Sequence, residues 1–267
     1  MRAFEHRHAG LRFTATESGE GQPMVFQHGL CGDASQPADV FPLGEGWRCI
    51  TLDCRGHGGS EPGPPDRFSI STFADDVASL IEAEKLAPVV LGGISMGAAI
   101  AMRLAVRNPQ LVRALVLARP AWLNDRAPAN MQPNEVVGNL LRRYPPSEAR
   151  ALFENSEIAR RLQAEAPDNL ASLRGFFSRQ PIAVTRELLC RISTDGPGVD
   201  ATSIAKISVP TLVVGNAFDL VHPLEHAKSL AAMVPKAHFI EITSKAISRE
   251  RYRSDFQTAL AAFLKES

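Results

Sequence analysis

Residues 89–99 read VVLGGISMGAA, and this stretch decides the fold. The apolar run 89–91 is short, which is typical of a buried strand, and the small apolar residues of Ala98–Val106 are typical of a helix packed against a sheet. Between them, the segment 93–97 has the form Gly-x-Ser-x-Gly. A strand that runs into a helix through so few residues must turn sharply, and such a turn lifts the hydroxyl of Ser95 above the edge of the sheet.

The same alternation of strand-like and helical segments continues on both sides of this turn. It predicts an α/β protein with a doubly wound, mostly parallel sheet and a small helical cap insertion. An opening pair of strands is expected at Phe4–His8 and Leu11–Thr16. A helix is expected around residues 73–81, with Ser69 or Ser71 as its N-cap, and a closing helix around 256–264. The remaining short apolar runs predict buried strands at 24–26, 49–52, 89–91, 114–117, 211–214 and 239–242.

Residues 122–200 differ from the rest of the chain. They contain no strand-like run and are interrupted by prolines at 128, 133, 145, 146, 167 and 181. We therefore predict that residues 1–121 and 201–267 form the α/β core, and that 122–200 form a helical insertion packed over the sheet.

Four motifs resemble those of the α/β-hydrolase family, and they follow one another along the chain in the same order as in that family. The Gly-x-Ser-x-Gly turn at Ser95 resembles the family's nucleophile elbow. The stretch VFQHGLCG at 25–32 resembles its His-Gly loop, and DCRGHGGS at 53–60 resembles a further glycine-rich loop. The stretch TLVVGNAFDLVHP at 211–223 resembles the strand that precedes the catalytic acid. The motifs span residues 25–223, and the sheet pattern extends the resemblance to nearly the whole chain.

This resemblance implies a serine hydrolase of small carboxylic esters, lactones or related acyl compounds. Ser95 would be the nucleophile and Asp219 the acid that orients a base. The N–H groups of Leu30 and Met96 would stabilise the oxyanion, with Gly29 in the same substrate-binding loop.

Two histidines in the glycine-rich loops and the serine at the elbow narrow the expected chemistry further. His28 and His57 are expected to organise loops rather than to act as bases. A serine at the elbow argues against haloalkane dehalogenase and epoxide hydrolase chemistry, which use aspartate there in this fold.

The chain departs from the family at the catalytic histidine, which should lie between the last strand and the closing helix. That position falls at or near Ala246, and no histidine follows His238, which is expected just before the last strand. A serine hydroxyl is a poor nucleophile unless a neighbouring base takes its proton. We interpret His222, three residues after Asp219, as the base, with a purely loop-satisfying role as its alternative.

Other residues near this loop are weaker candidates. Lys245 would have to be buried to lose its charge, and the polar Thr243 and Ser244 do not predict burial. His226 is expected on the surface of a helix.

Two further explanations of the missing histidine stay open at this point. The chain could be a variant in which alanine at 246 replaces a catalytic histidine, although the unusual residues on both sides favour natural divergence. Alternatively, an incomplete triad could serve a protein that binds a small molecule or guides a non-hydrolytic reaction.

Composition narrows the possible partners and surroundings. Lysine plus arginine and aspartate plus glutamate each number 29, so the net charge is zero and neither nucleic acid nor a membrane surface is an expected partner. We expect a small-molecule substrate and no metal or organic cofactor; the oligomeric state is left open. The first eight residues do not resemble a signal peptide, and the cysteines at 31, 49, 54 and 190 show no metal-ligand spacing. These features favour a cytoplasmic protein.

Overall fold

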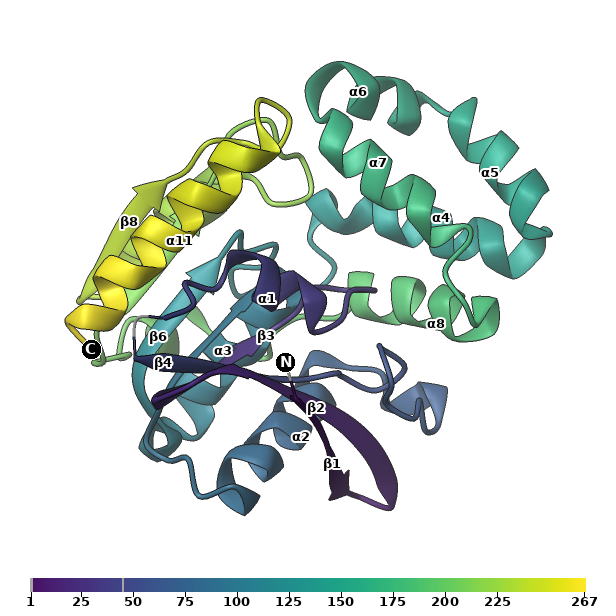
Figure 1. Cartoon of the computed structure of the whole chain (residues 1–267). Helices are drawn as coiled ribbons and strands as arrows, with labels where there is room; N and C mark the ends of the chain where they lie inside the picture. Colours follow the sequence, from purple (N-terminus) through teal and green to yellow (C-terminus); the bar gives the residue numbers. More distant parts are fainter. Residues whose placement is uncertain (1, 45) are drawn as a thin grey trace.

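A mixed sheet of eight strands forms the centre of the structure, a computed structural model that describes residues 2–44 and 46–267 (Figure 1). Every strand expected from the sequence is present. The last strand begins two residues earlier than expected, so His238 lies within it and not before it. The strands are β1 (Arg2–His8), β2 (Leu11–Gly19), β3 (Gln22–Gln27), β4 (Trp47–Leu52), β5 (Val89–Ile94), β6 (Val112–Ala118), β7 (Thr211–Gly215) and β8 (Ala237–Glu241).

The strands follow the order β1-β2-β4-β3-β5-β6-β7-β8. Only the pairs β1–β2 and β2–β4 are antiparallel, so β3 to β8 all point the same way. Strand β5 is central and buried throughout, with Leu91 facing one hydrophobic cluster and Val90 the other. A continuous apolar run is what a parallel strand needs when both faces of its sheet are covered.

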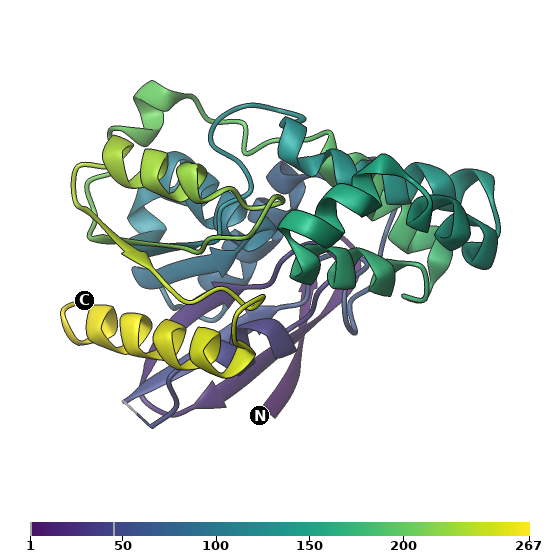
Figure 2. The same ribbon diagram turned by 90° about the horizontal axis from the view of Figure 1, so that it is seen from above.

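Helices supply that cover on each face (Figure 2). One face packs against α2 (Ile70–Ala83), α3 (Met96–Arg107) and α10 (Leu224–Met233), and the other against α1 (Ser35–Val40) and α11 (Arg249–Lys265). Ser69 caps α2 by accepting a hydrogen bond from the Thr72 N–H. In α11, Phe256 and Leu260 are fully buried, as their helical spacing predicts. Short helical turns complete the core: η1 (Pro65–Arg67), η2 (Pro109–Leu111) and α9 (Ala201–Ile204).

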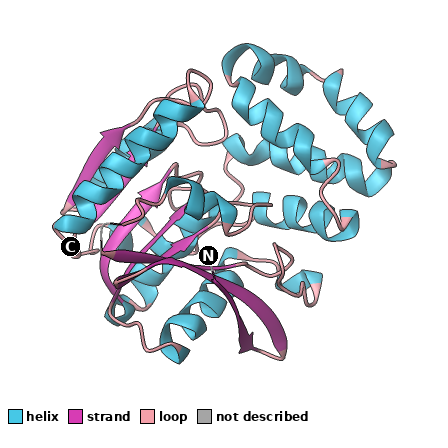
Figure 3. Ribbon diagram, viewed as in Figure 1, coloured by secondary structure: helices cyan, strands magenta, loops and turns pink. Residues whose placement is uncertain are grey.

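Residues 122–200 are helical and contain no strand (Figure 3). Their prolines begin helices instead of merely interrupting them: Pro133, Pro146 and Pro167 each lie in a first turn, where the missing N–H has no intrahelical partner to lose. The helices pack on one another beside the sheet, and in the following sections we call this segment the cap. Its elements are η3 (Ala129–Met131), α4 (Gln132–Arg143), α5 (Pro146–Glu154), α6 (Glu157–Glu165), α7 (Pro167–Phe176) and α8 (Ile182–Ser193).

Over residues 2–44 and 46–267, no helix combines the length and the apolar character that crossing a membrane requires.

Candidate active site

The turn between β5 and α3 holds Ser95 in a strained conformation. Its φ of 57° and ψ of −111° lie outside the regions that L-residues ordinarily occupy. The turn is tight enough to require glycine on both sides: a Cβ on Gly93 would lie 2.2 Å from the carbonyl carbon of Gly97, and one on Gly97 would lie 2.4 Å from the Gln27 oxygen. The Ser95 N–H donates to the Ala118 carbonyl at 2.9 Å, which ties the turn to β6. The serine side chain therefore lies at the carboxyl edge of the sheet, as its motif predicts.

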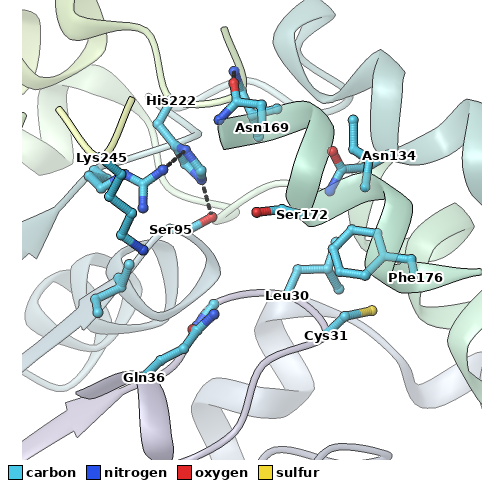
Figure 4. A pocket seen from close by; sticks show the side chains of 15 residues that line it. Leu30, Cys31, Gln36, Ser95, Asn134, Asn169, Ser172, Phe176, His222 and Lys245 are labelled. Atoms are coloured by element: carbon cyan, nitrogen blue, oxygen red, sulfur yellow. Dashed lines mark hydrogen bonds between the residues drawn. The ribbon is translucent and has the colours of Figure 1, made fainter. Parts of the chain in front are cut away.

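The loop after β7 brings His222 to this serine (Figure 4). The Nε2 atom of His222 lies 2.8 Å from the Ser95 Oγ, and its Nδ1 atom lies 2.9 and 3.0 Å from the two carboxylate oxygens of Asp219. The backbone N–H of His222 also donates to Asp219 Oδ1 at 2.9 Å. This second bond closes a turn in which the aspartate side chain fixes the backbone three residues later. The structure thus joins Ser95, His222 and Asp219 in one hydrogen-bonded chain.

Two residues that the sequence analysis did not single out hold Asp219 in place. Arg119, directly after β6, donates from Nε at 2.9 Å and from Nη2 at 2.6 Å to Asp219 Oδ2. Asn169, on cap helix α7, donates to Asp219 Oδ1 at 2.9 Å. The side-chain oxygen of Asn169 also accepts the N–H groups of Leu220 and Val221. The loop that carries His222 is therefore fastened to both the sheet and the cap.

These contacts set the charges of the group. Burial alone raises the pKa of Asp219, but the Arg119 guanidinium and the His222 ring outweigh it and hold that pKa far below its usual range. Burial lowers the pKa of His222, Asp219 opposes the shift, and Arg119, whose Nη2 is 3.2 Å from His222 Nδ1, adds to it. The net result is a lowered pKa for His222. At neutral pH the site therefore holds an aspartate anion and a neutral imidazole.

The loop after β3 faces Ser95 and is fixed at two of its N–H groups. The Gly29 N–H donates to Gln36 Oε1 at 2.8 Å, and the Cys31 N–H donates to His57 Nε2 at 3.0 Å. His28 accepts the Cys54 N–H at 3.0 Å, so both histidines brace loops, as expected. Leu30 lies between the two fixed positions and lines the same cavity as Ser95.

Met96 is the second residue that the motif assigns to oxyanion binding. It is fully buried and opens α3. Its N–H belongs to the first turn, where no intrahelical acceptor exists. Leu30 and Met96 are thus positioned by a braced loop and a helix start, respectively.

A cavity of about 250 Å³ lies over Ser95 between the sheet edge and the cap. Its size suits a small molecule. Cap helices α4 and α7 supply one side of it. The end of β5 with the turn at Ser95, helix α1 and the loops after β3, β6, β7 and β8 supply the rest. The apolar lining residues are Leu30, Ile94, Leu173, Phe176 and Val221, and the polar ones include Gln36, Asn134, Asn169, Ser172 and Lys245.

The remaining candidates from the sequence are placed as follows. Ala246 is exposed in the loop between β8 and α11, and its methyl group has no acid–base chemistry. Lys245 lines the cavity and is partly buried there, and desolvation lowers its pKa. His226, which was expected on the surface of a helix, lies on α10 and is half-buried.

Comparison with known proteins places these features in context. A family model described as alpha/beta hydrolase fold matches residues 22–246. A Mycobacterium tuberculosis protein named "Putative non-heme bromoperoxidase BpoC" is 31% identical over 85% of this chain and 87% of its own length. Its crystal structure superimposes with a TM-score of 0.72 at 27% identity, covering 98% of each chain.

Other relatives carry names that describe hydrolysis. The 2-hydroxymuconate semialdehyde hydrolase of Pseudomonas sp. strain CF600 is 29% identical over 86% of this chain and 81% of its own length. The solved structure of Est816, described as an N-acyl homoserine lactone degrading enzyme, has a TM-score of 0.70 at 27% identity and covers 97% of this chain and 99% of its own.

Proposed function

Because this chain belongs to the α/β-hydrolase fold family, we propose that it is a serine hydrolase acting on small carboxylic esters, lactones or related acyl compounds. The observation that carries the proposal is the distance of 2.8 Å between His222 Nε2 and Ser95 Oγ. A base within hydrogen-bond reach of the nucleophile is the first geometric requirement for this chemistry. The relatives whose names describe hydrolases and a lactone-degrading enzyme support the same class of reaction.

In the proposed mechanism the ionised Asp219 accepts the Nδ1–H of His222, which leaves the Nε2 lone pair facing the Ser95 hydroxyl. As Ser95 Oγ attacks the substrate carbonyl, its proton passes to Nε2. The imidazolium then gives that proton to the leaving alcohol, and an acyl-enzyme remains. Water attacks the acyl-enzyme by the same route in reverse, with His222 first as base and then as acid, and regenerates Ser95.

The negative charge that develops on the carbonyl oxygen needs donors that are already in place. We propose the N–H groups of Leu30 and Met96 for this role, with Gly29 in the same loop. Fixed donors stabilise the transition state without reorganisation, and removing one costs about 3 kcal/mol in comparable sites. The bracing of Gly29 and Cys31 on either side of Leu30 supports this assignment.

The position of the base is the distinctive part of the proposal. His222 would take the role that the family resemblance assigns to a histidine near Ala246. Acid and base then come from the same turn, because Asp219 fixes both the backbone N–H and the ring of His222. This favours natural divergence over a trapped variant with a missing base.

The test combines covalent labelling with turnover. A fluorophosphonate probe should label Ser95, and 4-nitrophenyl acetate should be hydrolysed; Ser95→Ala should abolish both. His222→Gln should lower kcat by roughly two to four powers of ten, since general-base help is worth about that much. His238→Gln, an exposed histidine on β8, is the matched control and should leave kcat unchanged.

Two results would count against the proposal. Unchanged turnover in His222→Gln would remove His222 as the base. No labelling and no turnover in the unmodified protein would favour the alternative, a member of the fold that binds a small molecule or guides a non-hydrolytic reaction.

A further inference from the structure

The ammonium group of Lys245 enters the cavity from the loop between β8 and α11 (Figure 4). Its Nζ lies 4.7 Å from the centroid of the Tyr252 ring, which gives the cation a face to rest on but no negative charge. In the part of the chain that the structure describes, Lys245 forms no ion pair with a carboxylate. Lys245 is therefore a partly buried lysine at the cavity that forms no ion pair within the described residues.

The acidic residues around Lys245 are already engaged by arginines. Asp168 pairs with Arg249 at 3.2 Å, and Asp39 pairs with Arg253 at 2.6 Å. Asp219 accepts both hydrogen bonds from Arg119. Each of these three carboxylates thus has a guanidinium partner, and within the described residues none of them forms an ion pair with Lys245.

A second observation comes from the cap side of the cavity. Asn134, on α4, is only 5% exposed, and its side-chain oxygen has no hydrogen-bond partner among the described residues. Buried polar groups without a partner are uncommon in native proteins and call for an explanation. Asn134 lines the cavity, and Figure 4 shows it on the opposite side of Ser95 from Lys245. Lys245 and the side chain of Asn134 therefore lie on either side of the serine.

We propose that the substrate carries a carboxylate that pairs with Lys245 at one end of the cavity, while a polar group at its other end hydrogen-bonds to Asn134. This inference rests on the proposed serine hydrolase function and names its substrate class. The ester or lactone carbonyl lies between the two contacts, above Ser95. A bound carboxylate would also oppose the effect of burial on Lys245, because a neighbouring anion raises the pKa that burial lowers.

Two pairs of esters test the proposal, one for each end of the scissile bond. Mono-(4-nitrophenyl) adipate and 4-nitrophenyl hexanoate differ by a carboxylate on the acyl side. The second pair, 4-acetoxybenzoate and phenyl acetate, differs by a carboxylate on the leaving group. For each pair, kcat/KM is divided by the rate of uncatalysed hydrolysis, so that intrinsic reactivity cancels.

In at least one pair, the carboxylate ester should be preferred by roughly tenfold or more, as a charge-assisted hydrogen bond allows. Lys245→Met should abolish that preference while neutral esters are still hydrolysed, and Lys245→Arg should retain most of it. Lys236→Met removes an exposed lysine outside the cavity and should keep the preference.

The outcomes separate the two levels of inference. Turnover of neutral esters with no carboxylate preference in either pair, or a preference that survives in Lys245→Met, overturns the substrate class and leaves the proposed function standing. No turnover of any ester together with no labelling of Ser95 overturns both.

Discussion

Arg119→Met is the substitution that tests most directly how the site is held together. Arg119 is 8% exposed and Asp219 is 7% exposed, so their ion pair is shielded from solvent. Removing one partner of a buried pair typically costs about 3–5 kcal/mol, because the remaining charge stays buried without its counter-ion. Asp219 keeps its bonds to Asn169 and His222, so the lower end of that range, about 3 kcal/mol of unfolding free energy, is expected.

The same substitution should change the pH dependence of catalysis. Arg119 lowers the pKa of His222. Losing its positive charge lets that pKa rise, so a higher pH is needed to keep the imidazole neutral. The acidic limb of the kcat/KM profile should therefore move to higher pH. A structural loss alone would lower the melting temperature, by roughly 6–12 °C for about 3 kcal/mol in a domain of this size, without moving the limb.

Arg55→Met is the matched control for this experiment. Arg55 and Asp76 form a second buried pair, with two hydrogen bonds of 2.7 Å, away from Ser95. Both variants should melt earlier in calorimetry, but only Arg119→Met should shift the acidic limb measured with 4-nitrophenyl acetate. A limb that stays in place in Arg119→Met, moves to lower pH, or moves equally in Arg55→Met would refute the reasoning.

Three further outcomes are expected. In the unmodified protein, kcat/KM should fall as pH drops through the pKa of His222, with a midpoint below its ordinary value of about 6.5; a midpoint above 7 in initial-rate assays would contradict the assigned burial. Asn169→Ala removes the bonds to Asp219, Leu220 and Val221, so kcat should fall by roughly tenfold or more, whereas Asn155→Ala on the exposed end of α5 should not affect it. Gly97→Ala should destabilise the protein by about 3 kcal/mol in denaturant titration, because the added Cβ would clash with backbone atoms. Gly175→Ala on α7, where no atom lies within 4 Å of the added Cβ, should stabilise the protein slightly. Similar changes in the free energy of unfolding for the two variants would argue against a tight turn at Gly97.

Much of the fold could be predicted because the parallel strands are buried on both faces and read as short apolar runs. The ends of strands are harder to predict where hydrogen bonding to neighbouring strands overrides the conformational preference of the residues themselves. Strand β5 was expected to end at Leu91, yet it continues to Ile94 because Gly92 and Gly93 pair with Phe26 and Gln27. Glycine disfavours strand conformation, but here the pairing with a neighbouring strand keeps both glycines in the sheet.

The site was predictable where its parts lie close together in the chain. The elbow at Ser95 and the short spacing from Asp219 to His222 are visible in the sequence, and the structure joins all three residues. Arg119 could have been found from the sequence, because it is a single charged residue directly after a buried apolar strand. The carboxyl ends of parallel strands form the edge of the sheet where binding and active sites usually lie. Asn169 left none, because it lies 50 residues from Asp219 and only the packing of the cap brings it there.

The turn that carries both Asp219 and His222 has a consequence for protein engineering. Because only two residues separate Asp219 from His222, the proposed proton relay takes its acid and base from one short loop, and neither comes from the connection between β8 and α11. New chain ends opened at Ala246–Ile247 by circular permutation would leave the relay whole, whereas an opening between 219 and 222 would sever it. Grafting this loop onto another sheet that presents a serine at such a bend would also require counterparts of Arg119 and Asn169, which hold Asp219 in place.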